Sequence, residues 1–119
     1  MNTVKANVTL PTNIVVARKE RDLRLHFLQQ TEGEGAPQRI TLEKPEMVIG
    51  RSEEADIRLV SERASRQHAL LSRLQQDYEI RDNDSRNGVY LNGVKVHSAT
   101  LRDGDVVQVA NSVFIYHEG

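Results

Sequence analysis

The chain has 119 residues, 38% of them apolar and 28% charged, which fits one soluble domain with a modest core. It lacks cysteine and any apolar run of about 18 residues, so it offers no disulfide, thiolate metal site or thiol nucleophile, and we expect a cytoplasmic protein that does not bind membranes. The net charge is only −1, whereas nucleic-acid binders carry a basic excess, so any anion must be bound by a few local arginines.

The N-terminal residues differ from the rest of the chain. A strand-like alternation is interrupted at residues 11–13, and a mixed-charge stretch follows; the alternating residues are Val4, Ala6, Val8 and Leu10. We interpret residues 1–20 as an N-terminal extension, either an edge strand or a flexible arm, and residues 21–119 as the domain proper.

From Leu23 onward, short apolar segments alternate with turns, which is typical of an all-β sandwich. Leu23, Leu25 and Phe27 alternate with polar or apolar neighbours, and a polar loop spans residues 31–37. The next apolar segments are Ile40 with Leu42, then 47–49 ending at Gly50, then 57–60.

Residues 61–76 are ambiguous from local preference alone. Most of them favour a helix, and Ser61 could cap its N-terminus. Helix propensity is easily overridden in an all-β context, so this segment stays open at this point.

The C-terminal third predicts a β-meander. Asn92-Gly93 separates residues 89–91 from residues 94–96, and this dipeptide is preferred in two-residue hairpins because both turn positions need positive φ. Asp103-Gly104 then precedes a strand over 106–109, and residues 110–112 turn the chain into 113–116.

Two clusters contain residues suited to an anion. Gly50-Arg51-Ser52 follows a buried strand, although Arg51 could simply pair with Glu53 or Glu54. In 65–68 (Ser-Arg-Gln-His), a hydroxyl lies beside a guanidinium, a combination that suits phosphate because the hydroxyl reaches one oxygen and the planar fork two others. We interpret His68 as a structural hydrogen-bonding group.

The third cluster is a turn-rich stretch over residues 82–88. Asn87-Gly88 predicts a tight turn that leaves Arg86 and the Asn87 side chain projecting. An asparagine amide both donates and accepts, which suits contact with an extended peptide backbone. Taken alone, this is an unremarkable turn.

The order and spacing of these clusters, with Asn92-Gly93 and Leu101-x-Asp-Gly-Asp105, resemble the forkhead-associated (FHA) domain family over about residues 23–117. The resemblance implies an FHA/SMAD-like β-sandwich of two packed sheets with the recognition loops at one end. It also implies that residues 63–67 form a loop, 69–74 a strand and 75–77 its turn.

The resemblance further implies the roles of the site residues. Arg51 and Ser65 would hold the phosphate of a phosphothreonine, with Arg66 joining them. Asn87 would bond the ligand backbone, and Arg86 would line the same groove. The supporting residues would be Gly50, His68 and Gly88, with a framework of Asp56, Asp82, Asn92 and Gly93.

The chain departs from the family pattern at two positions. Val89 stands where threonine is usual, which predicts a small packing change with little effect on binding. Arg86 stands where many members have threonine, so it could add a cation at the phosphate or select acidic ligand residues, or Asp84 could neutralise it.

We therefore expect a phosphothreonine-peptide-binding adaptor without cofactor, metal or catalytic residues. Its partner would be a threonine-phosphorylated protein or peptide, a Ser/Thr kinase or its substrate. The alternative is an FHA-like interaction or oligomerisation module that binds partners independently of phosphate. An enzyme is disfavoured because the four histidines lack metal-ligand spacing and nothing suggests a third residue to orient a pair formed by Ser65 and His68.

Overall fold

Residues 25–118, which the computed structural model describes, form eleven strands and no helix that could cross a membrane. In chain order the strands are β1 (His26–Glu32), β2 (Gln38–Leu42), β3 (Glu46–Gly50), β4 (Ile57–Arg58), β5 (Ala69–Leu74), β6 (Asp77–Asp82), β7 (Val89–Leu91), β8 (Val94–Val96), β9 (Ser98–Thr100), β10 (Val106–Val109) and β11 (Ser112–Glu118).

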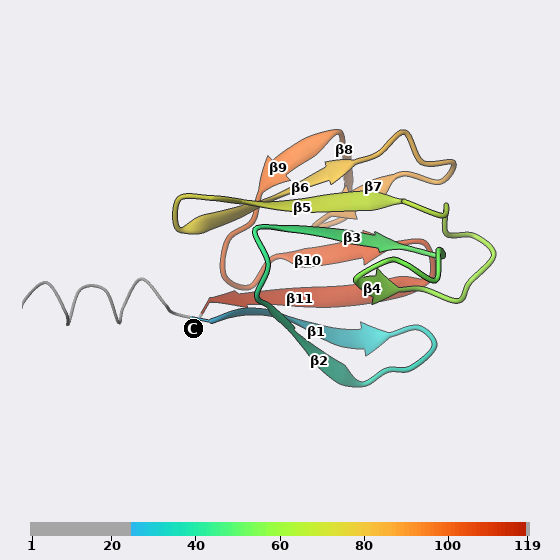
Figure 1. Ribbon diagram of the computed structural model, residues 1–119, viewed down its shortest axis with the longest axis horizontal. Helices are drawn as coiled ribbons and strands as arrows, with labels where there is room; N and C mark the ends of the chain where they lie inside the picture. Colours follow the sequence, from blue (N-terminus) through green and yellow to red (C-terminus); the bar gives the residue numbers. More distant parts are fainter. Residues whose placement is uncertain (1–24, 119) are drawn as a thin grey trace, which may run out of the picture.

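The strands build two sheets that pack face to face (Figure 1). The six-stranded sheet has the order β2-β1-β11-β10-β7-β8, and the five-stranded sheet has the order β4-β3-β5-β6-β9. Neighbouring strands are antiparallel except β3 and β4, which are parallel. The expected all-β sandwich of two packed sheets is confirmed.

The core lies between the sheets and follows the two-residue period of each strand. Buried residues alternate with more exposed ones along most of β3, β5, β6, β10 and β11, and the largest buried side chains among them include Tyr78, Tyr116 and Phe114. Val89, at one of the positions that depart from the family pattern, is fully buried on β7, as its structural role required.

The strands predicted in the C-terminal third are present, but they do not form a simple meander, because β9 joins the other sheet and β10 pairs with β7 rather than β8. Asn92 and Gly93 have φ values of 52° and 85° and join β7 to β8, and β10 spans the predicted residues. The ambiguous segment follows the resemblance rather than local helix preference, since Ala69–Leu74 is β5. The turn after it is shorter than expected, because Asp77 already belongs to β6.

The predicted extension over residues 1–20 lies outside the described residues, so the boundary at residue 21 stays a prediction. On β1, the buried side chains are His26, Leu28 and Gln30, while Leu25 is exposed and Phe27 half-buried. The apolar alternation at 23–27 therefore does not mark the buried face of this strand.

Two polar side chains can occupy the buried face of β1 because each has partners there. His26 Nδ1 and the Tyr116 hydroxyl form a buried hydrogen bond, and burial, followed by the nearby carboxylates, raises the pKa of Tyr116. Gln30 donates to Ser112 Oγ and accepts from Gln38 Nε2 at 2.7 Å. Each of these two side chains thus has a buried hydrogen-bond partner within the protein.

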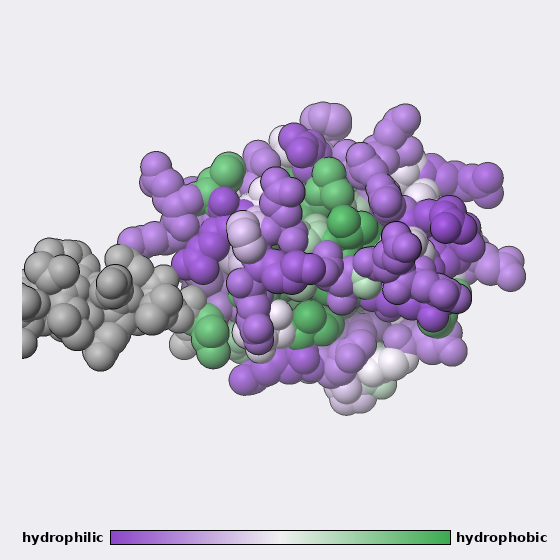
Figure 2. Space-filling view, viewed as in Figure 1, coloured by the Kyte–Doolittle hydropathy of each residue, from purple (hydrophilic) through white to green (hydrophobic). Residues whose placement is uncertain are grey.

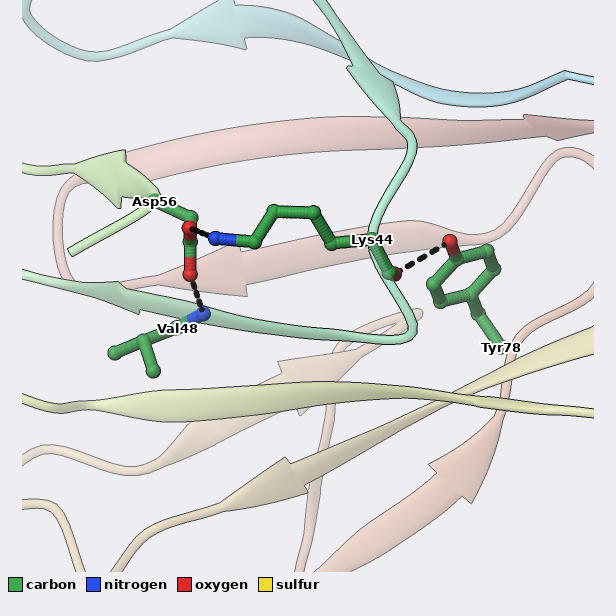
Figure 3. Close-up of polar contacts among 4 residues, drawn as sticks. All are labelled: Lys44, Val48, Asp56 and Tyr78. Carbon is green, nitrogen blue, oxygen red and sulfur yellow. Dashed lines mark hydrogen bonds and ion pairs between the residues drawn. The ribbon is translucent and has the colours of Figure 1, made fainter.

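Asp56 secures the exposed edge of β3 beside the short strand β4 (Figure 3). Its carboxylate accepts the Val48 backbone N–H at 2.8 Å and contacts Lys44 Nζ. The backbone carbonyl of Lys44 in turn accepts the Tyr78 hydroxyl at 3.0 Å. The Lys44 hydrogen bond, with that from Val48, lowers the pKa of Asp56 below its ordinary value of 3.8. Asp56 therefore anchors one end of the loop between β3 and β4, in the framework role that the resemblance implied.

Replacing Asp56 by alanine should lower the free energy of unfolding at pH 7 by about 1 to 2 kcal/mol, since a charged acceptor of two hydrogen bonds is lost. A carboxyl whose pKa is lower in the folded chain stabilises the fold above the unfolded-state pKa and loses that contribution as the pH falls through the folded-state value. The difference between wild type and Asp56→Ala should therefore shrink below about pH 4.

Urea unfolding at pH 7 and pH 3 measures this difference. Glu43→Ala is the matched control, because Glu43 is an exposed carboxylate next to Lys44 and should change stability little at either pH. An Asp56→Ala effect that is equally large at both pH values would contradict the ionic role of this carboxylate.

Candidate functional site

Three loops meet at one end of the sandwich, on the right in Figure 1. They span residues 51–56, 59–68 and 83–88, and they include all the residues predicted from the clusters except Gly50, which ends β3. Figure 2 shows hydrophilic side chains over this end of the molecule. The sandwich therefore brings together segments that lie up to 37 residues apart in the chain (51 to 88).

Backbone hydrogen bonds place the first two clusters side by side. Arg51 N–H donates to the Ser65 carbonyl and Ser52 N–H donates to the Arg66 carbonyl, both at 3.0 Å. At Gly50, an added Cβ would lie 2.1 Å from the Arg66 carbonyl oxygen. Glycine is required there because the second loop passes where any side chain would begin.

His68 joins this loop to the third cluster. Its ring is fully buried, and Nδ1 accepts the Ser65 backbone N–H at 3.0 Å. Because Nδ1 accepts, the neutral ring carries its proton on Nε2, which donates to the Gly88 carbonyl at 2.8 Å. The predicted structural role of His68 thus has a direct geometric basis.

The third cluster is tied together by Asp82 and Ser85. The Ser85 hydroxyl donates to Asp82 Oδ1 and accepts the Gly88 N–H at 2.8 Å. Gly88 has a φ of 83°, a conformation in which a side chain is strained. These bonds set the backbone between them, so that the Arg86 N–H donates to Ser65 Oγ at 3.1 Å.

The Ser65 hydroxyl keeps its own proton available. Its oxygen accepts the Arg86 backbone N–H, which leaves the hydroxyl proton available for donation. Arg51 Nε donates to the Ala64 carbonyl at 3.1 Å, which holds the side chain while the two terminal NH₂ groups retain their donors. Within residues 25–118, no carboxylate pairs with Arg51, so neither Glu53 nor Glu54 neutralises it.

A pocket of about 250 Å³ opens between these loops. Four of the five predicted binding residues line it, namely Arg51, Ser65, Arg66 and Arg86, together with Glu62, Arg63 and Ala64. The structure thus gathers arginines from all three clusters around one hydroxyl. Such a concave, donor-rich surface suits an anion with several oxygens.

Asn87, the fifth predicted residue, lines a neighbouring pocket of about 290 Å³. Its Nδ2 donates to the Arg63 carbonyl at 2.7 Å, which leaves one amide N–H and the amide oxygen available. Arg63 lines both pockets, so they form one continuous surface; the other lining residues here are Tyr90, Gln108 and Ala110.

Sequence reasoning missed Arg63, Tyr90 and Gln108 as candidates. Arg63 could have been found from its position, because it lies two residues before Ser65 in the same predicted loop. Tyr90 and Gln108 are paired neighbours on β7 and β10, and this pairing over 18 residues (90 to 108) leaves no local mark in the sequence.

Ser65 and His68 do not form a nucleophile and base pair. The ring nitrogen that could accept a proton is occupied by the Ser65 backbone N–H, and the other nitrogen donates to Gly88. Nor does the part of the chain that the structure describes contain three His, Cys, Asp or Glu residues placed to hold a metal ion.

The comparisons with known proteins agree with this geometry. The model of the FHA domain family matches residues 47–110. An ABC transporter ATP-binding/permease protein of Mycobacterium tuberculosis is 42% identical over 85 residues, which are 70% of this chain and 10% of that protein. An oxoglutarate dehydrogenase inhibitor of Corynebacterium diphtheriae is 36% identical over 87 residues, 73% of this chain and 61% of that protein.

A solved structure described as a structural and functional analysis of phosphothreonine-dependent FHA domain interactions superimposes with a TM-score of 0.72. It is 29% identical to this chain, and the match covers 78% of this chain and 95% of that one. The chain belongs to the FHA domain family. It spans about a tenth of the transporter and about three fifths of the inhibitor, so it corresponds to part of each of these relatives.

Replacing His68 by alanine should lower the free energy of unfolding by about 2 to 4 kcal/mol, because two hydrogen bonds are lost and a cavity opens under the loops. Urea unfolding followed by circular dichroism measures the loss. His97→Ala is the control, since His97 is exposed and should change stability by less than about 0.5 kcal/mol. Equal stability of wild type and His68→Ala would contradict the bridging role.

Proposed function

We propose that this chain is a phosphothreonine-dependent interaction module that binds a phosphorylated segment of a partner protein. The observation that carries the proposal is the pocket in which the Ser65 hydroxyl and the terminal NH₂ groups of Arg51 remain available as donors, while the backbone around them is held by other bonds. The donors are therefore preorganised for an anion, which lowers the entropic cost of binding.

A phosphothreonine presents three terminal oxygens and a charge near −2 to this pocket. The Arg51 guanidinium spans two oxygens and the Ser65 hydroxyl donates to the third, while Arg66 supplies further positive charge. Hydrogen bonds to charged groups contribute about 1.5 to 3 kcal/mol each. A few of them, less the cost of ordering a peptide, correspond to a Kd of about a micromolar.

The peptide backbone then continues over the second pocket. The free N–H and carbonyl of the Asn87 amide can pair with one peptide unit, as an added strand would. Beyond Asn87, the Tyr90 ring and the Gln108 amide offer a mixed apolar and polar surface for a following side chain. This pocket has no carboxylate in its lining, in contrast to the pocket around Ser65, which Glu62 joins.

The partner in this proposal is a Ser/Thr kinase or one of its substrates, and the binding takes place in the cytoplasm, where such kinases use ATP. Two of the similar proteins support a binding role: one is named as an inhibitor, and the solved structure concerns phosphothreonine-dependent interactions. We assign the domain to residues 21–119, with residues 1–20 as an extension.

Arg51→Ala and Ser65→Ala should each weaken binding of a phosphothreonine peptide at least about tenfold, because each removes a hydrogen bond to a charged group. Fluorescence anisotropy against a degenerate phosphothreonine library measures the affinity. Unphosphorylated and phosphoserine versions of the same library show how far binding depends on the phosphate and on the threonine methyl group.

Arg81→Ala is the control, since Arg81 is an exposed arginine on β6 outside the pocket lining. It should retain the wild-type affinity. Binding of partners that persists in Arg51→Ala and does not require phosphate would refute the proposal and support the alternative, a phosphate-independent interaction module.

A further inference from the structure

Among the described residues that line the pocket around Ser65, Glu62 is the single acidic one. The other charged residues of this phosphate pocket are Arg51, Arg63, Arg66 and Arg86. Glu62 also lines an adjoining pocket of about 590 Å³, where three arginines and three glutamates have formal charges that cancel. The other two glutamates there, Glu53 and Glu54, do not line the phosphate pocket. Glu62 is therefore the carboxylate placed closest to a bound phosphate.

A short turn fixes the backbone on either side of Glu62. The Ala64 N–H donates to the Ser61 carbonyl at 3.1 Å, and the Arg63 N–H donates to Ser61 Oγ at 3.0 Å. The Ala64 carbonyl accepts Arg51 Nε at 3.1 Å, which ties this turn to the arginine that would hold the phosphate. The loop therefore keeps Glu62 beside the phosphate position.

The Glu62 side chain is exposed, and none of the ion pairs within residues 25–118 includes it. A carboxylate that served to orient one of the neighbouring arginines would form an ion pair with it. An unpaired carboxylate instead leaves its negative charge directed at whatever enters the pocket. A phosphothreonine brings a charge near −2, so the interaction between Glu62 and the phosphate is repulsive.

We propose that Glu62 limits the affinity of the pocket by opposing the charge of the phosphate. This inference rests on the proposed phosphothreonine binding and concerns its strength. The arginines attract the phosphate, and Glu62 offsets part of that attraction, so a phosphorylated segment binds less tightly than the arginines alone would allow. Because Glu62 is exposed, the repulsion is screened over about 8 to 10 Å at physiological salt and weakens as salt is added.

Removal of this charge tests the inference. Glu62→Gln keeps the size of the side chain and should lower Kd about threefold to tenfold at about 50 mM NaCl. The ligand is the tightest-binding peptide of the phosphothreonine library, and the readout is fluorescence anisotropy. At about 500 mM NaCl the gain should fall below about twofold, because screening removes an electrostatic effect and leaves a purely structural one. Glu62→Asp retains the charge and should bind within about twofold of wild type.

Three control variants assign the effect to Glu62. Glu53→Gln and Glu54→Gln each remove a carboxylate that lines only the adjoining pocket, so each should lower Kd less than Glu62→Gln does. Glu46→Gln changes an exposed glutamate on β3 outside both linings and should keep the wild-type affinity. Urea unfolding of every variant shows whether its fold is as stable as that of wild type.

The outcomes separate this inference from the function on which it rests. Equal or weaker binding by Glu62→Gln would overturn the inference and leave the proposed function intact. A gain that persists at high salt, or that Glu53→Gln and Glu54→Gln reproduce in full, would also overturn it. No binding of any phosphothreonine peptide by the folded chain would overturn both. Tighter binding by Glu62→Gln that high salt abolishes supports the opposing role of Glu62.

Discussion

The buried imidazole of His68 is the interaction on which the loop end depends. One nitrogen accepts from the loop that carries Ser65 and the other donates to Gly88 in the loop that carries Arg86 and Asn87. Because the ring is fully buried, water cannot replace either bond, and the two loops are held at one separation. That separation decides whether donors from different parts of the chain can reach one ligand.

Around His68, the groups that align the loops differ from the groups that remain available to a ligand. Backbone atoms make the bonds that align the loops, as where Arg51 and Ser52 donate to the carbonyls of Ser65 and Arg66. Gly50 permits this close approach because it has no Cβ. The exposed side chains therefore keep donors available for a ligand. The alignment of the loops does not depend on the flexible arginine side chains.

The charged residues of the molecule are also unevenly distributed. A chain with a net charge of −1 attracts phosphate weakly as a whole, yet four arginines line one pocket with a single glutamate. Interactions between exposed charges are screened over about 8 to 10 Å at physiological salt, so the local excess matters more than the distant carboxylates. The placement of these arginines can therefore create a local attraction for an anion even though the net charge is near zero.

The sequence by itself determined the sandwich, the Asn92-Gly93 hairpin and the ordered clusters that include Arg51, Ser65 and His68, because turns and alternation are local properties and the motifs have characteristic spacing. Local preference failed for residues 61–76, where pairing with β3 and β6 overrides helix propensity. Only the tertiary structure decided that Tyr90 and Gln108 adjoin Asn87 and that Arg63 lines both pockets. Those neighbours meet through strand pairing and loop packing between distant residues, which no short stretch of sequence encodes.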